Sequence, residues 1–374
     1  MKPFSVYISE QQRIELVDNI NDIITSGQFV LGEYTEQLEN LISSDMRKFG
    51  AKLVSSGTVA LEAVFEFLKK RDGKHNVAVQ SNTNFATVSS IMRSGLNPIL
   101  IDCDYMGQMC LDDLKSKASK YGFKTVAIVH IGGYCSRNLK DIIEYVKINN
   151  LTLIEDCAHS HGAYFSGQAL GTFGEASILS FFPTKLVNGG EGGAVISENS
   201  ELIEFVHKWR NQGKGGVYGN HHEVLGGSYR MPEINCSIAL QYYKILNQEI
   251  SKRRELYEIM LGELNPKVQL NQISHMDQCS FYKVILRYPG FAGSIFEERL
   301  REVEIFCGGG VYRSPIHAQP VFDEISAGTE ALRITNEFCD EHFCPPLHSN
   351  ITKAQMIQIC AEINKIVGEL SENG

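Results

Sequence analysis

The chain has 374 residues, of which 43% are hydrophobic, so it can bury a large core as one large domain or as two. Its net charge of -9 and its pI of about 5.7, with no long block of lysine and arginine, argue against a nucleic-acid-binding surface. No apolar run approaches the length that spans a bilayer, and the first residues lack the apolar core of a signal peptide, so we expect a cytoplasmic protein without a membrane partner.

Short apolar runs alternate with amphipathic stretches between about residues 51 and 196. This alternation is typical of an α/β domain with a mostly parallel sheet and helices on both faces. The runs that we predict as strands read AKLVSS, VAVQSN, PILIDC, TVAIVHI, TLIEDC, ILSFF and GAVISE.

Residues 54–61 (VSSGTVAL) precede an amphipathic helical pattern. Ser56, Gly57 and Thr58 fall where the first amides of that helix have no internal partner, so their N–H and hydroxyl groups could receive a phosphate. Ordinary helix capping uses the same residue types, and this alternative stays open at this point.

Residues 151–163 (LTLIEDCAHSHGA) begin with a short apolar run typical of a strand. This run ends in Glu155 and Asp156, and small residues and histidines follow. Ligands of open α/β sheets sit at the carboxyl ends of the strands, which is where Asp156 falls. A carboxylate there can keep the nitrogen of a pyridine ring protonated. Asp156 could also be only a helix cap.

Residues 180–193 (SFFPTKLVNGGEGG) place one lysine between an apolar run and a glycine-rich turn. A lysine held in a partly desolvated pocket loses its proton more easily and becomes a nucleophile, so Lys185 is a candidate Schiff-base lysine. A surface lysine before a flexible hairpin is the other interpretation.

A long helical pattern over residues 233–261 follows Pro232 and leads into a mixed region. We place a soft domain boundary near residue 245, which divides the chain into residues 1–245, with an N-terminal arm, and residues 246–374.

The ten cysteines are scattered, and none has CxxC or CxxH spacing. We therefore expect reduced, mostly buried thiols and no metal site. The nearest candidate grouping has irregular spacing and consists of Cys339, His342, Cys344 and His348.

Taken together, these segments resemble the DegT/DnrJ/EryC1/StrS family of aminotransferases, which use pyridoxal 5'-phosphate and mostly aminate keto groups on nucleotide-linked sugars. The resemblance covers nearly the whole chain and rests on GQFVLGEYTEQLE (from Gly27), SSGTVAL, SNTNFAT, EDCAHSHGA, SFFPTKLVNGGEGG, YRMPEINCSIAL and PPLHSNIT. It implies the fold type I of these enzymes, which is aspartate aminotransferase-like, with a large cofactor domain and a smaller C-terminal α+β domain.

The resemblance also assigns roles to individual residues. Lys185 matches the Schiff-base lysine, Asp156 the partner of the pyridine nitrogen, and His159 a position beside the cofactor ring. The phosphate cradle matches Gly57, Thr58 and Ser180, with Ser56 next to them.

Two positions depart from the family pattern. Asn84 stands where the family usually has an aromatic ring that stacks on the cofactor, so either Phe85 covers the ring or the asparagine amide does. Ser228 stands where the family commonly has an asparagine that reaches the phosphate of the partner subunit's cofactor. Nearby Arg230 fits a substrate contact and a structural ion pair about equally well.

Residues 308–322 (GGGVYRSPIHAQPVF) resemble the family's substrate segment, which makes Tyr312, His317 and Gln319 candidate sugar contacts. A histidine between prolines can instead simply fill a turn. The three leading glycines would allow this loop to move around a bulky substrate.

The resemblance implies L-glutamate as the usual amino donor, a keto-sugar nucleotide as acceptor, and a homodimer whose subunits complete each other's sites. A cyclitol ketone is an alternative acceptor. Related dehydratases carry histidine in place of the lysine, so Lys185 argues against that activity, and a regulatory relative would need a DNA-binding extension that we do not find.

Overall fold

The structure, a computed structural model, describes residues 1–5, 7–215, 219–330 and 332–372. Its strands are β1 (Gly50–Val54), β2 (Asn76–Gln80), β3 (Asn97–Ile101), β4 (Thr125–Val129), β5 (Thr152–Asp156), β6 (Tyr164–Phe165), β7 (Gln168–Ala169), β8 (Ala176–Ser180), β9 (Gly193–Ser197), β10 (Gln269–Leu270), β11 (Leu286–Arg287) and β12 (His342–Phe343).

The α-helices are α1 (Glu10–Ser26), α2 (Glu33–Asp45), α3 (Gly57–Asp72), α4 (Phe85–Arg93), α5 (Leu111–Tyr121), α6 (Leu139–Ile148), α7 (Ser200–Trp209), α8 (Glu233–Lys244), α9 (Leu246–Glu263), α10 (Gly293–Glu302), α11 (Arg333–Glu341) and α12 (Lys353–Glu372). The described residues also contain three short 3-10 helices, η1 (Ile131–Gly133), η2 (Ile316–Ala318) and η3 (Pro320–Phe322). Among the described helices, none is both long enough and apolar enough to cross a bilayer.

The central sheet contains all seven strands predicted from the apolar runs, in the order β1-β9-β8-β5-β4-β2-β3. The pairs β2/β3, β2/β4, β4/β5 and β5/β8 are parallel. Strand β9 is antiparallel to both β8 and β1, so β1 runs in the same direction as β8. The sheet is therefore mostly parallel, as predicted, and the carboxyl ends of six strands lie along one edge.

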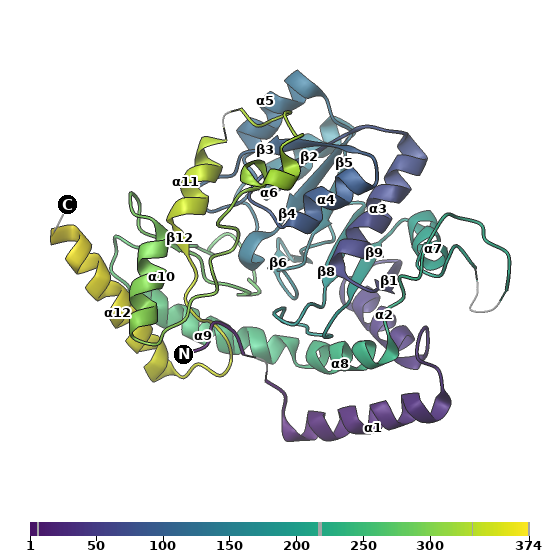
Figure 1. The fold of residues 1–374 in the computed structure, drawn as a ribbon, viewed down its shortest axis with the longest axis horizontal. Coiled ribbons are helices and arrows are strands. Elements are labelled where there is room, and N and C mark those ends of the chain that lie inside the picture. Colours follow the sequence, from purple (N-terminus) through teal and green to yellow (C-terminus); the bar gives the residue numbers. More distant parts are fainter. Residues whose placement is uncertain (6, 216–218, 331, 373–374) are drawn as a thin grey trace.

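Helices cover both faces of this sheet and form a three-layer arrangement (Figure 1). One face packs under α3, α4 and α7, whose apolar side chains form one buried cluster with the strands. The opposite face packs against α2, α5 and α6, in a second cluster that continues into α8, α9 and α12. The strands are apolar on both faces because neither face meets water.

Helix α8 holds the start of α2. The carboxylate of Glu233, at the first turn of α8, accepts hydrogen bonds from the amides of Gly32 (2.9 Å), Tyr34 (2.8 Å) and Thr35 (3.1 Å). Gly32 at the N-cap has no side chain of its own, so the carboxylate of a distant helix satisfies the first amides of α2.

The single helix expected over residues 233–261 is two helices, which corrects that prediction. The chain leaves helical geometry at Ile245, with φ of -105° and ψ of 6°, between α8 and α9. This junction falls at the predicted domain boundary, and a small antiparallel sheet of β10, β11 and β12 lies beyond it. The division into two domains stays a prediction, because one buried cluster contains residues from both sides of the junction.

The chain returns late in the sequence to the edge of the central sheet at β3. The amide of Leu100 donates to the Ala327 carbonyl at 3.2 Å, and the amide of Thr335 donates to the Asp102 carboxylate at 2.7 Å. Buried Ile316 and Phe322 complete the cluster beneath α3 and α4. This crossing brings the segment around Tyr312 close to the carboxyl edge of the sheet.

Candidate active site

A cavity of about 380 Å³ opens at the carboxyl edge of the central sheet. Strands β1, β4, β5 and β8 all deliver residues to it, because they end at the same edge. Nine residues singled out in the sequence line it, namely Ser56, Gly57, Thr58, Asn84, Asp156, His159, Ser180, Lys185 and Tyr312.

One end of the cavity is the N-terminus of α3. Ser56 is the N-cap, and its Oγ accepts the Val59 amide at 3.2 Å, so the capping interpretation is correct for this serine. Within the described residues, the amides of Gly57 and Thr58 have no assigned acceptor. A Cβ on Gly57 would lie 2.9 Å from Cβ of Ser180, so glycine is what allows α3 and the end of β8 to meet. Free amides beside a hydroxyl fit a phosphate.

Asp156 is buried at the end of β5. Its Oδ2 accepts a hydrogen bond from Thr87 Oγ1 at 2.9 Å, and its Oδ1 accepts one from the Ala158 amide at 3.1 Å. Burial raises the pKa of the carboxyl, against the lowering effect of these two hydrogen bonds. The residues after Asp156 form turns and no helix, so the helix-cap alternative is wrong. A buried carboxylate without a cation bonded to it, in the described chain, fits a protonated ring nitrogen.

His159 is a neutral imidazole in a fixed orientation. The Gly132 amide donates to Nδ1 at 3.2 Å, which assigns the ring proton to Nε2, facing the Tyr312 hydroxyl at 3.3 Å. Burial lowers its pKa well below the ordinary value, and the nearby Lys185 amine adds to the effect. His159 therefore offers an uncharged ring face beside the cavity.

Lys185 lies in the loop between β8 and β9 and is half-buried. Its amide donates to the Phe182 carbonyl at 2.9 Å, and its Nζ lies 4.7 Å from the centroid of the Tyr282 ring. Sequence reasoning missed Tyr282, which comes from a loop after α9.

Asn84, and not Phe85, lines the cavity. The Asn84 side chain caps α4 by accepting the Ala86 amide at 2.9 Å, and the Tyr312 hydroxyl bonds to the same side chain. Phe85 is 53% exposed, and its ring packs against Phe322 at 5.4 Å. Which of the two residues covers a cofactor ring stays a prediction, and the cavity lining favours Asn84.

Four predicted residues do not line the cavity within this chain. Arg230 donates to Ser228 Oγ and, at 2.6 Å, to Asn211 Oδ1, and no carboxylate pairs with it in the described part of the chain. His317 uses both ring nitrogens, with Ser81 Oγ at 2.7 Å and Asn336 Oδ1 at 2.9 Å. Gln319 donates to the Ser314 carbonyl at 3.1 Å. Their substrate and cofactor roles stay predictions.

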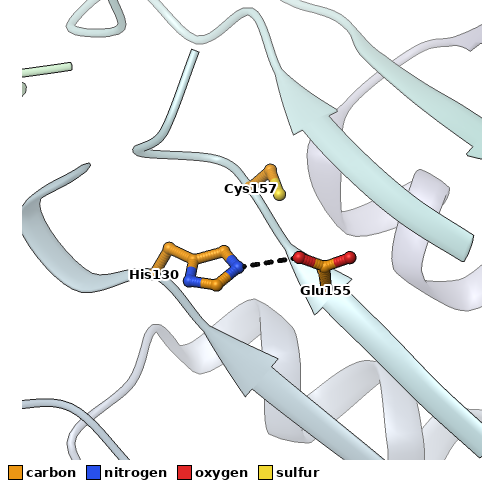
Figure 2. A group of neighbouring side chains, drawn as sticks. All are labelled: His130, Glu155 and Cys157. Atoms are coloured by element: carbon orange, nitrogen blue, oxygen red, sulfur yellow. Dashed lines mark hydrogen bonds and ion pairs between the residues drawn. The ribbon is translucent and has the colours of Figure 1, made fainter. Parts of the chain in front are cut away.

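His130, Glu155 and Cys157 form a buried group, in which Glu155 and Cys157 flank Asp156 in the sequence (Figure 2). His130 contacts a Glu155 oxygen at 3.0 Å, and the same carboxylate accepts the amides of Gly171 (2.8 Å), Phe173 (2.7 Å) and Gly174 (2.7 Å). These four hydrogen bonds occupy the carboxylate, so we interpret it as the anchor of the loop that leads into β8. The grouping Cys339, His342, Cys344 and His348 does not come together as a ligand set in the described chain.

Sequence reasoning missed several residues around the cavity. Thr87 has a signal in SNTNFAT, because it lies one helical turn after Asn84. Glu191 and Phe182 line the cavity and belong to the lysine segment, but nothing in the pattern set them apart.

The comparisons with known proteins agree with this geometry. A profile of the DegT/DnrJ/EryC1/StrS aminotransferase family matches residues 10–364. GDP-perosamine synthase of Escherichia coli O157:H7 is 29% identical over 340 residues, which cover 90% of this chain and 91% of that protein. GDP-perosamine synthase of Vibrio cholerae is 31% identical over 353 residues, which cover 91% and 93%.

Among solved structures, a DegT DnrJ EryC1 StrS aminotransferase from Brucella abortus matches with a TM-score of 0.89 at 21% identity, over 98% of this chain and all of that chain. This likeness confirms the expected fold class. The match of the family profile to most of the sequence, together with the relative that is 31% identical, decides the assignment. The chain therefore belongs to the DegT/DnrJ/EryC1/StrS aminotransferase family.

Proposed function

We propose that this aminotransferase uses pyridoxal 5'-phosphate to move an amino group from L-glutamate to a keto group on a nucleotide-linked sugar. The relatives whose names support this acceptor are GDP-perosamine synthases and a dTDP-3-amino-3,4,6-trideoxy-alpha-D-glucose transaminase. The observation that carries the proposal is that one cavity holds the Lys185 amine, the buried Asp156 carboxyl and the free amides of Gly57 and Thr58.

These groups fit the three reactive parts of the cofactor. The amides of Gly57 and Thr58, with the Ser180 hydroxyl, would hold its phosphate. Asp156 would hold the ring nitrogen in its protonated form, since a buried carboxylate is strongly stabilised by an adjacent positive charge. Lys185 supplies the primary amine that attaches the cofactor covalently.

When bound, pyridoxal phosphate supplies an electron sink for the electrons released as the α-carbon of the amino donor loses its proton. Lys185 would take that proton and pass it on, since its amine lines the same cavity. Thr87 and Ala158 hold the two oxygens of Asp156 in place, so the carboxylate keeps its orientation. His159 lies beside the ring position as an uncharged group and adds no competing positive charge.

Lys185 also separates this proposal from sugar dehydration. The dehydratases of this family are expected to carry histidine at that position, and here a lysine lines the cavity. Tyr312, which reaches the cavity from the late-crossing segment, is the best placed of the proposed sugar contacts.

We further propose a homodimer with shared sites. Ser228, which is exposed, and Arg230, which is half-buried, do not line the cavity of their own chain and lie before α8. A two-fold interface would present the same segment of each chain to the other's cavity. Ser228 would then contact the phosphate of the partner subunit's cofactor.

The test is a two-stage assay with purified protein loaded with pyridoxal phosphate. L-glutamate, L-glutamine and L-alanine are compared as donors by the change in visible absorbance, and a panel of nucleotide-linked keto-sugars and one cyclitol ketone is then offered as acceptor. We expect glutamate to react fastest and a nucleotide-linked amino sugar to appear by mass spectrometry, with Lys185→Ala inactive. Amination of the cyclitol alone would contradict the proposed acceptor, and a faster reaction with another donor would contradict glutamate.

A further inference from the structure

Tyr282 lies in contact with the Lys185 amine, although it was not among the residues predicted from the sequence. Nζ of Lys185 lies 4.7 Å from the ring centroid, and it is near enough to the Tyr282 hydroxyl to lower its pKa. The same hydroxyl lies 3.1 Å from Thr184 Oγ1, the residue next to the lysine. Tyr282 therefore meets the lysine with both its ring and its oxygen.

The loop that carries Tyr282 is held in a conformation that its sequence does not favour. Phe281, just before it, is completely buried and has φ of +52°, a region that bulky residues rarely adopt. The guanidinium of Arg253 stabilises this shape by donating to the carbonyls of Phe281 (3.2 Å) and Tyr282 (3.3 Å). An unfavourable backbone held in place by its surroundings is more common at functional sites than elsewhere.

The loop is also tied directly to the cavity. The Ser280 hydroxyl donates to the His159 carbonyl at 2.6 Å, and the rings of Tyr282 and His159 stack with centroids 4.2 Å apart. His159 and Lys185 thus enclose the Tyr282 ring from the cavity side. On its other side Tyr282 borders a second cavity of about 370 Å³, which Lys283 and Arg253 also line.

The charges around Tyr282 favour loss of its proton. Burial raises the pKa of its hydroxyl, but the ammonium groups of Lys185 and Lys283, with hydrogen bonds from Thr184 and Lys185, bring it below the ordinary value of 10.0. His159 is neutral, and Arg253 adds a further cation beside the loop. No carboxylate in the described chain hydrogen-bonds the hydroxyl to oppose this effect.

We propose that Tyr282 is a catalytic residue that holds the Lys185 amine and exchanges a proton with it during amino transfer. This inference rests on the proposed function, in which Lys185 acts first as a nucleophile and then as a base. Both tasks need the lysine as a neutral amine near physiological pH.

The proton balance is simple. The pair starts as ammonium and phenol, and it loses one proton to solvent to give ammonium and phenolate. The remaining proton then moves from Nζ to the phenolate oxygen, which leaves a neutral amine and a phenol. When Lys185 takes a proton from the substrate, the pair becomes ammonium and phenol again, and it returns to neutral amine and phenol once Nζ passes that proton on.

Tyr282→Phe tests this, because it keeps the ring that stacks on His159 and removes only the oxygen. Tyr288→Phe is the matched control, since it removes a hydroxyl that contacts Ser371 in another part of the molecule. The first readout is the ultraviolet titration of tyrosinate in cofactor-free protein. We expect one tyrosine that ionises before the others, that is missing in Tyr282→Phe, and that ionises at higher pH in Lys185→Met.

The second readout is the reaction of the loaded enzyme with glutamate over a range of pH. We expect Tyr282→Phe to lower its rate constant about 100-fold, with little change in the half-saturating glutamate concentration and with a changed pH profile. Wild-type rates in a folded Tyr282→Phe protein, or an early tyrosinate titration that survives this substitution, would overturn the proposal. Should wild type not react with any donor, the proposed function fails, and the tyrosinate titration decides the pairing of Tyr282 with Lys185 by itself.

Discussion

The hydroxyl of Thr87 donates a hydrogen bond to Oδ2 of Asp156 at 2.9 Å, and this bond ties the end of β5 to helix α4. Thr87 is completely buried and in turn lies 3.1 Å from the hydroxyl of Thr83, so the acid is oriented by a short chain of hydroxyls. An acid held this way cannot rotate away from the cavity without leaving a buried donor unsatisfied.

Thr87→Val should remove this orientation while preserving volume and the branched side chain. We expect the half-reaction with glutamate to slow about 10-fold, because the carboxylate keeps its charge but loses one hydrogen-bond donor. Thr125→Val is the control, since Thr125 is equally buried at the opposite end of β4, where it contacts His75. Equal rates in the two variants would show that the Thr87 hydroxyl is only structural.

Asp156→Asn should lower activity and raise stability. Burial raises the pKa of the Asp156 carboxyl in the folded protein, so the fold favours its protonated form. The stability that this preference contributes is fully present below the ordinary pKa of 3.8 and is lost as the pH rises through the raised pKa. At neutral pH the cofactor-free variant should therefore melt at a higher temperature than wild type, and the difference should shrink in acid. Its half-reaction should be at least about 100-fold slower, since the ring nitrogen loses its charged partner. Calorimetry against pH and single-turnover kinetics measure the two effects, and a rate like wild type would refute the catalytic role.

Lys185→Ala should abolish covalent attachment of the cofactor. After borohydride reduction and proteolysis of the wild type, we expect the label on the peptide that contains Lys185, because only a primary amine in the cavity can form the bond. Lys267→Ala, at an exposed lysine, serves as the control and should label normally. A label on any other lysine would show that the central assignment is wrong.

Glu155→Gln should destabilise the protein through the loop before β8. The carboxylate accepts the amide of Gly171 with one oxygen and the amides of Phe173 and Gly174 with the other. In glutamine an NH2 group replaces one of these oxygens, so at least one buried amide loses its acceptor. We therefore expect the free energy of unfolding to fall by about 3 kcal/mol. Glu330→Gln, which breaks a surface pair with Lys120, should cost less than about 1 kcal/mol. Chemical denaturation measures the stability of both variants, and similar denaturation midpoints would argue against Glu155 as the anchor of the loop before β8.

Ser228→Asn should strengthen retention of the cofactor on dilution. The longer side chain restores the reach that the family usually has across the proposed dimer interface, and cofactor affinity in wild type should fall as subunits separate. Sedimentation at graded concentrations, read by visible absorbance, follows mass and cofactor together. Monomers that keep the cofactor at full occupancy would exclude a shared site.

The central sheet could be predicted because each strand is a short apolar run bounded by turn residues, and this local pattern survives folding. The placement of Asp156 and Lys185 near one edge was predictable for a related reason, since Asp156 ends strand β5 and Lys185 lies in the loop that follows strand β8. The one break that the pattern concealed is at Ile245, where the apolar spacing continues although the helix does not.

Tyr282 could not be predicted from the sequence. Its contact with Lys185 depends on a loop from a distant part of the chain. In that loop Phe281 adopts a left-handed conformation, which is rare for phenylalanine and is not predicted by its residue type. The sequence also could not decide which of the neighbours Asn84 and Phe85 lines the cavity. The Phe85 ring packs against Phe322 outside the cavity, and this contact between distant segments leaves Asn84 to line it.

The late return of the chain to β3 limits how this enzyme can be recombined with its relatives. Ile316, Phe322 and Leu332 belong to the same buried cluster as helices α3 and α4, although they lie far beyond the α8/α9 junction in the sequence. A chimera with a single crossover at residue 245 would pair these side chains with a foreign surface and leave voids or clashes beneath the cavity. Exchange of specificity between family members should therefore transplant the segment from Tyr312 to Leu332 together with the helices that it packs against.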